Sequence, residues 1–71
     1  MNFIKIKNKS DKCDSIVNLD NVAYINQDYD FQKRKIGSTI YFIDKELDTI
    51  RTDMNLLSIE NSIKKLKNQK G

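Results

Sequence analysis

Residues 39–43 have the sequence Thr39-Ile40-Tyr41-Phe42-Ile43, which is the most strand-like stretch of the chain. Every residue in it is β-branched or aromatic, and these types favour a pleated, half-buried strand. If Ile40 and Phe42 face the core, the alternation of side chains along a strand turns Tyr41 and Ile43 the other way. The stretch therefore predicts a central strand that is apolar on both faces.

Further strands are expected on either side of this one. Residues 2–7 alternate, with Ile4 and Ile6 on one face and Phe3 on the other, which predicts a strand. Residues 28–38 are polar and predict a long connection ending near Gly37. The other expected strands are residues 15–18, 23–27 and 47–52, with a tight turn at residues 19–22.

The C-terminal part of the chain has the periodicity of a helix. Its apolar residues Leu56, Ile59, Ile63 and Leu66 form one stripe, and lysines follow toward the C-terminal end. Three residues are candidates for the N-cap of this helix: Asp53, Asn55 and Ser58.

These patterns together predict an α+β fold, in which three or four antiparallel strands form a meander and one C-terminal α-helix packs on one face. The 71 residues suffice for one domain, expected over residues 1–67, with a flexible tail at 68–71. The apolar residues expected inside are Ile4, Ile6, Ile16, Leu19, Val22, Ile25, Ile40, Phe42, Leu47, Ile50, Leu56, Ile59, Ile63 and Leu66.

Such a short chain has a thin core, because a domain of this size buries only about 60% of its unfolded surface. A disulfide cannot reinforce it, since Cys13 is the only cysteine. A structural zinc ion is equally unexpected, because the chain has no histidine and one thiolate cannot complete a four-ligand site. Association of copies is the stabiliser that remains.

The composition excludes several classes of protein. The net charge of +3 comes from 13 basic residues interspersed with 10 acidic ones, which is ordinary for a soluble protein. The sequence contains no apolar run long enough to cross a membrane, and its N-terminus lacks the pattern of a signal peptide. The single cysteine then favours a cytoplasmic location, and the Lys- and Asn-rich, proline-free composition suggests bacterial or phage origin.

Catalytic and metal chemistry find little support in the sequence. Histidine, the commonest general acid or base, is absent, and Cys13 is flanked only by residues of a turn. The alternating carboxylates at residues 28–30 and 44–48 lack the glycine and the distal glutamate of a calcium loop. We therefore expect neither an enzyme nor a bound cofactor or metal.

Two surfaces are candidates for binding. The first is the outer face of the sheet, where Phe3, Tyr41 and Ile43 are expected to support self-association, joined by Ala23 or Ile25 depending on strand register. The second is a loop in which aromatic and basic residues alternate, as in proteins that bind single-stranded nucleic acid. Its residues are Tyr29, Phe31, Lys33, Arg34 and Lys35.

Three stretches resemble the small bacterial proteins of the flagellar FlbD type. They are residues 16–25 (Ile-Val-Asn-Leu-Asp-Asn-Val-Ala-Tyr-Ile), residues 39–44 (Thr-Ile-Tyr-Phe-Ile-Asp) and residues 58–63 (Ser-Ile-Glu-Asn-Ser-Ile). The chain departs from that pattern in lacking the proline at Leu19-Asp20-Asn21 and in having Lys45-Glu46 where a hairpin glycine is usual. The resemblance implies a small accessory or regulatory protein and carries over no catalytic residue.

The sequence thus predicts a small, non-enzymatic interaction or regulatory protein that acts as a homo-oligomer or with another protein as partner. The alternative is a nucleic-acid-binding module that uses the loop at residues 29–35.

Overall fold

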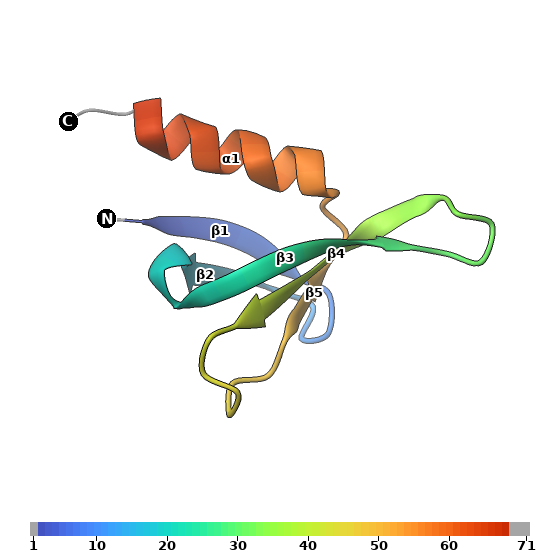
Figure 1. The fold of residues 1–71 in the computed structure, drawn as a ribbon, viewed down its shortest axis with the longest axis horizontal. Helices are drawn as coiled ribbons and strands as arrows, with labels where there is room; N and C mark the ends of the chain where they lie inside the picture. Colours follow the sequence, from blue (N-terminus) through green and yellow to red (C-terminus); the bar gives the residue numbers. More distant parts are fainter. Residues whose placement is uncertain (1, 69–71) are drawn as a thin grey trace.

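The computed structural model describes residues 2–68, and the side chains of residues 2–67. β1 and β2 form a two-stranded antiparallel sheet, β3, β4 and β5 form a three-stranded antiparallel meander, and α1 lies along one side of the strands (Figure 1). The elements in chain order are β1 (Phe3–Asn8), β2 (Cys13–Asn18), the 3-10 helix η1 (Leu19–Asn21), β3 (Val22–Tyr29), β4 (Lys35–Phe42), β5 (Ile50–Thr52) and α1 (Leu56–Asn68). The predicted α+β fold is confirmed, although its five strands are divided between two sheets.

The two sheets meet where the end of β1 lies beside β5. The backbone N–H of Lys9 donates to the carbonyl oxygen of Arg51 at 2.7 Å, and Leu19 N–H donates to the carbonyl oxygen of Asn2 at 2.7 Å. The first bond joins the β1–β2 hairpin to the meander, and the second ties the residue before β1 to the start of η1. As a result, the hairpin and α1 together cover the inner side of the three-stranded sheet.

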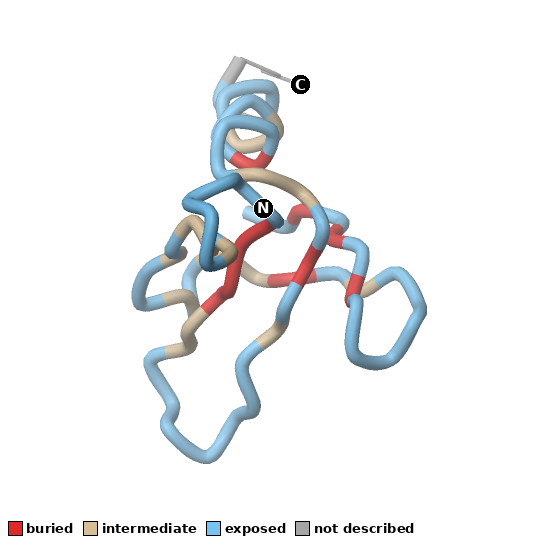
Figure 2. Tube along the Cα trace, turned by 90° about the vertical axis from the view of Figure 1, so that its right-hand side faces the viewer, coloured by how far each residue is buried: buried red, intermediate tan, exposed pale blue. Residues whose placement is uncertain are grey.

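The core is small and lies beneath α1 (Figure 2). The strands contribute alternate apolar residues to it, and α1 contributes one fully buried side chain, that of Ile59. Its buried members are Ile4, Ile6, Val17, Ile40 and Ile59. Leu19, Val22, Ile25, Phe42, Ile50, Met54, Ile63 and Leu66 are partly buried around them.

Three residues predicted for the core are exposed instead. Ile16 is 75% exposed because the β1–β2 register pairs Ile4 with Val17, so Val17 takes the inward position. Leu47 lies in the connection between β4 and β5, and Leu56 is the first residue of α1, at the edge of the apolar stripe.

The long connection predicted at residues 28–38 is wrong. The β3–β4 ladder continues through the pairs Asp28–Gly37 and Tyr29–Lys35, which leaves a five-residue turn, residues 30–34, at the end of a projecting hairpin (Figure 1). The strand expected at residues 47–52 shortens to Ile50–Thr52.

Two further expectations concern the C-terminal tail and membrane-spanning segments. α1 includes Asn68, so the helix extends one residue into the predicted tail, and the rest of that tail, residues 69–71, lies outside the described residues. Between residues 2 and 68, no helix is long and apolar enough to span a membrane.

Candidate functional site

An apolar surface occupies the side of the meander that faces away from the core. Tyr24 and Tyr41 stack there, with ring centroids 4.6 Å apart and planes inclined by 24°. Ile43 is 64% exposed and Leu47 is 48% exposed, and both line the same shallow groove as the two tyrosines. We call these four residues, Tyr24, Tyr41, Ile43 and Leu47, the tyrosine face.

A bulge in β3 creates this arrangement. Val22 pairs with Phe42 and Ile25 pairs with Ile40, so Ala23 and Tyr24 together oppose the single residue Tyr41. The extra residue puts Tyr24 on the outer face beside Tyr41, while Ile25 stays partly buried against the core. Of the two residues that the sequence left open, Ala23 lines the groove and Ile25 does not.

The structure separates Phe3 from the other predicted self-association residues. Phe3 begins β1 in the two-stranded sheet, whereas Tyr41 lies in β4 of the meander and Ile43 directly follows that strand. Phe3 is partly exposed but does not line the groove of the tyrosine face. Tyr41 and Ile43 therefore belong to one surface, to which Tyr24 and Leu47 are added.

The predicted nucleic-acid residues are divided between two places. Phe31, 92% exposed, and Lys33 lie in the turn at the end of the β3–β4 hairpin. Tyr29 and Lys35 lie at its base and line a groove beside α1. Arg34 is paired with Asp30, whose carboxylate oxygen is 3.0 Å from Nε of the guanidinium group.

Asp30 organises the hairpin turn. Its carboxylate accepts hydrogen bonds from the backbone N–H groups of Gln32 at 2.8 Å and Arg34 at 2.9 Å. The backbone N–H of Arg34 is the main cause that lowers the pKa of Asp30 below its ordinary value of 3.8; the Arg34 side chain and the Gln32 N–H act in the same direction, and desolvation opposes them.

The turn should therefore loosen only when the pH falls below the ordinary pKa of an aspartate. Because the folded-state pKa of Asp30 is lowered, its stabilising effect is present above the unfolded-state pKa and is lost as pH falls through the folded-state value. An NMR titration is expected to give Asp30 a midpoint below 3.8, with the Arg34 amide resonance moving at the same midpoint. A midpoint at or above 3.8 would show that these hydrogen bonds do not form in solution.

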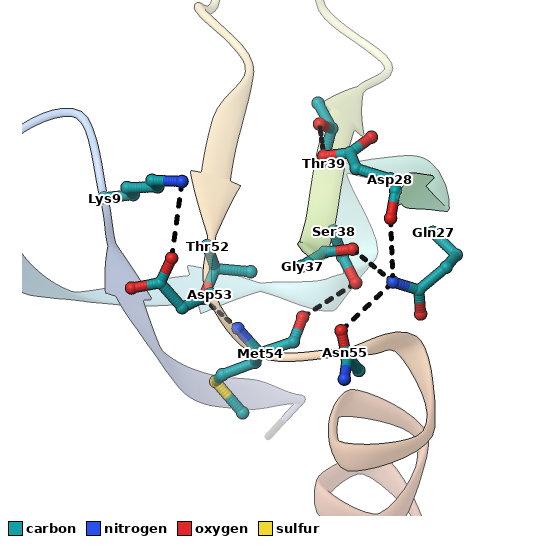
Figure 3. A network of polar contacts seen from close by, with 10 residues as sticks. All are labelled: Lys9, Gln27, Asp28, Gly37, Ser38, Thr39, Thr52, Asp53, Met54 and Asn55. Carbon is teal, nitrogen blue, oxygen red and sulfur yellow. Dashed lines mark hydrogen bonds and ion pairs between the residues drawn. The ribbon is translucent and has the colours of Figure 1, made fainter. Parts of the chain in front are cut away.

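A second polar cluster fixes the start of α1 (Figure 3). Gln27 of β3 accepts a hydrogen bond from the backbone N–H of Leu56 through Oε1 at 2.8 Å. Its Nε2 donates to the carbonyl oxygen of Gly37 at 2.6 Å and to Oδ1 of Asn55 at 3.1 Å. One side chain thus joins β3, β4 and the first turn of α1.

This geometry answers the question of the helix cap. Asn55 directly precedes α1, and its carbonyl oxygen accepts the N–H of Ile59 at 3.2 Å, as expected of an N-cap residue. The side chain that caps Leu56, however, is Gln27, which no local sequence pattern indicates. Asp53 instead lies 3.5 Å from the Lys9 ammonium group, and Ser58 lies inside the helix.

Gln27→Ala is expected to lower the free energy of unfolding by about 2 kcal/mol, because it removes the cap and leaves polar groups without partners. Hydrogen exchange at the Leu56 amide should accelerate. Gln27→Glu, which keeps the acceptor and loses the donor, should have an intermediate effect.

Gln32→Ala is the matched control for this change, since Gln32 is exposed in the hairpin turn and only its backbone contacts Asp30. It should change stability by less than about 0.5 kcal/mol. Equal stabilities of the Gln27→Ala and Gln32→Ala proteins in urea denaturation would refute the role of Gln27.

Comparison with known proteins supplies no relative: no family model, no curated protein and no solved structure matches this chain. Function is therefore argued from the surfaces themselves.

Proposed function

We propose that this chain is a non-enzymatic interaction protein whose copies associate through the tyrosine face. The observation that carries the proposal is the stacked pair Tyr24–Tyr41 with Ile43 exposed beside it, on the face of the meander opposite to the buried Ile40. Adjacent exposed apolar side chains of this kind mark interaction sites more often than scattered ones do.

The composition of the groove supports an interface between proteins. Among the residues that line it, only Lys45 is charged, and two are tyrosines. Interface centres are depleted in charge and enriched in aromatic residues. Tyrosine also retains a hydroxyl group that can find a partner at a partly wet boundary.

The thin core supplies the energetic reason for association. Five apolar side chains are buried, and at about 2 kcal/mol each they stabilise the fold only modestly. Burying Ile43 and Leu47 against a second copy would add two more side chains of the same kind. We propose a second copy as the partner at the tyrosine face, because every copy of the protein meets other copies of itself.

Ile43→Lys is expected to prevent this association. Sedimentation equilibrium of the wild-type protein should give about twice the 8.3 kDa of one chain at concentrations in the high micromolar range, and the variant should give one chain. A buried lysine without a partner is strongly unfavourable, so we expect the dissociation constant to rise at least about 100-fold.

Ile16→Lys is the matched control, because Ile16 is an equally exposed isoleucine in β2 of the other sheet. This variant should associate as the wild type does. A single-chain mass for the wild type at every concentration, or equal dissociation by both lysine variants, would refute the proposal.

The sequence supports a proposed location and a non-enzymatic role. We place the protein in the cytoplasm on the strength of its single cysteine, Cys13, which is free and exposed. The non-enzymatic role is supported by a sequence without histidine. The regulatory role implied by the FlbD-type resemblance stays a prediction.

The nucleic-acid hypothesis is the weaker of the two. Arg34 is held by Asp30, and Lys35 lies at the base of the hairpin, so the exposed aromatic ring of Phe31 has Lys33 as the cation beside it in the turn. One or two cations neutralise few phosphates and give little affinity for a nucleic-acid backbone.

A further inference from the structure

A second groove runs between β3 and α1. Its walls are formed by Ile25, Gln27 and Tyr29 of β3 on one side and by Leu56, Ile59 and Ile63 of α1 on the other. The helix residues that line it span positions 56 to 67, a length of about 16 Å at 1.5 Å per residue. An extended peptide of about five residues has the same length.

One wall of this groove belongs to a strand with a free edge. β3 is the outermost strand of its sheet, and within residues 2–68 it pairs along its length with β4 alone. Exposed edges are commonly protected by lysine, proline or β-bulges. β3, with the sequence Val-Ala-Tyr-Ile-Asn-Gln-Asp-Tyr, contains neither lysine nor proline, and its register shifts lie near its two ends, between Val22 and Tyr24 and between Asp28 and Tyr29. Residues 24–28 pair with β4 without interruption.

The charges at the groove select its occupant. Lys35, Lys64 and Lys67 line it against the single carboxylate of Glu60, so the groove is net positive. An acidic segment is therefore favoured over a basic one. A second copy is disfavoured, because symmetric pairing of two β3 edges would bring two such sets of lysines toward each other.

We propose that the groove between β3 and α1 binds an acidic, extended segment of a partner protein, which adds to β3 as a further strand. The backbone of β3 supplies the hydrogen bonds, the apolar residues of α1 receive alternate side chains, and the lysines pair with acidic ones. The site does not depend on the tyrosine face, since Ile43 and Leu47 lie outside this groove.

The test uses fluorescent eight-residue peptides in which glutamate alternates with valine, leucine or phenylalanine. Fluorescence anisotropy against the full chain should show saturable binding of at least one of them, with a dissociation constant of about 10–100 μM. Two versions of that peptide carry N-methyl groups on alternate amides, one on the odd and one on the even residues, because successive N–H groups of a strand point to opposite edges. The version methylated on the edge that faces β3 should not bind. A version with lysine in place of glutamate should bind at least about tenfold more weakly.

Two neighbouring lysines of α1 provide the matched variants. Lys64 lines the groove and Lys65 does not, although both are exposed. Lys64→Glu should weaken binding about fivefold, and Lys65→Glu should change it less than twofold. Circular dichroism of both variants should match that of the wild type.

Four outcomes would overturn the proposal. They are no binding of any glutamate peptide at millimolar concentration, equal binding of the lysine peptide, undiminished binding of both N-methylated peptides, and protection of the amides of residues 25–29 that appears on concentrating the protein without peptide. The last outcome would assign the groove to a second copy. Failure of the tyrosine-face proposal would be recognised separately, by a single-chain mass in sedimentation.

Discussion

Gly37→Ala is expected to lower the free energy of unfolding by about 3–5 kcal/mol, enough to leave much of a domain of this size unfolded. Gly37 has a φ of +128°, a backbone conformation that side-chain-bearing residues rarely adopt. An added Cβ would overlap the carbonyl oxygen of Thr52 and would lie 3.1 Å from its carbonyl carbon and 3.2 Å from Cα of Asp53. Neither Thr52 nor Asp53 can move away, because the backbone of β5 passes directly into the turn that begins α1.

Urea denaturation with circular dichroism measures this effect. Ile36→Ala is the control, because Ile36 is the preceding residue of β4 and is partly exposed. This variant should lower the free energy of unfolding by less than about 1.5 kcal/mol. If Gly37→Ala changes the free energy of unfolding by less than about 1 kcal/mol, β4 and the end of β5 are not in close contact.

Ile59→Ala is expected to have the second largest effect, about 2–5 kcal/mol. Ile59 is 1% exposed and is the side chain through which α1 joins the buried core cluster of the strands. Removing it leaves a cavity between the helix and both sheets, and a 13-residue helix is marginal by itself in water. The melting temperature should fall by at least about 10 °C.

Leu57→Ala controls for the helix itself, since Leu57 lies two residues away and is 63% exposed. Leu57→Ala should lower the free energy of unfolding by less than about 1 kcal/mol. If Ile59→Ala and Leu57→Ala melt at the same temperature, α1 is not docked through Ile59.

Alternation and periodicity suffice to predict the fold class. Ile4 and Ile6 face the core as the pattern indicates, and Ile59 anchors the helix as its apolar stripe suggests. The error at Ile16 has a physical cause: adjacent Ile16 and Val17 are both good strand residues, and only the pairing with β1 decides which one faces inward.

The candidate site was partly predictable. Alternation with Ile40 and Phe42 predicts that Tyr41 and Ile43 lie on the outer face of the sheet. It does not predict the same for Tyr24, because the position of Tyr24 depends on a bulge at Ala23 that no sequence pattern indicates. The cap from Gln27 to Leu56 joins residues 29 positions apart, and local patterns carry no signal for such a contact.

Local sequence patterns carry no signal for the groove beside α1 either. The polar composition of residues 28–38 predicts a loop, whereas β3 extends through Tyr29 and is an edge strand of its sheet. Proximity in sequence places Tyr29 and Lys35 in one loop with Phe31. The ladder at the base of the hairpin instead puts them beside the helix.

Dilution followed by two-dimensional amide NMR tests the tyrosine face most directly, since it reports both association and its location. Between about 1 mM and 20 μM, a range that spans weak to moderate dissociation constants, the amides of Tyr24, Tyr41, Ile43 and Leu47 should shift while that of Ile16 stays in place. Spectra identical at all concentrations, or shifts centred on β1 and β2, would contradict the account.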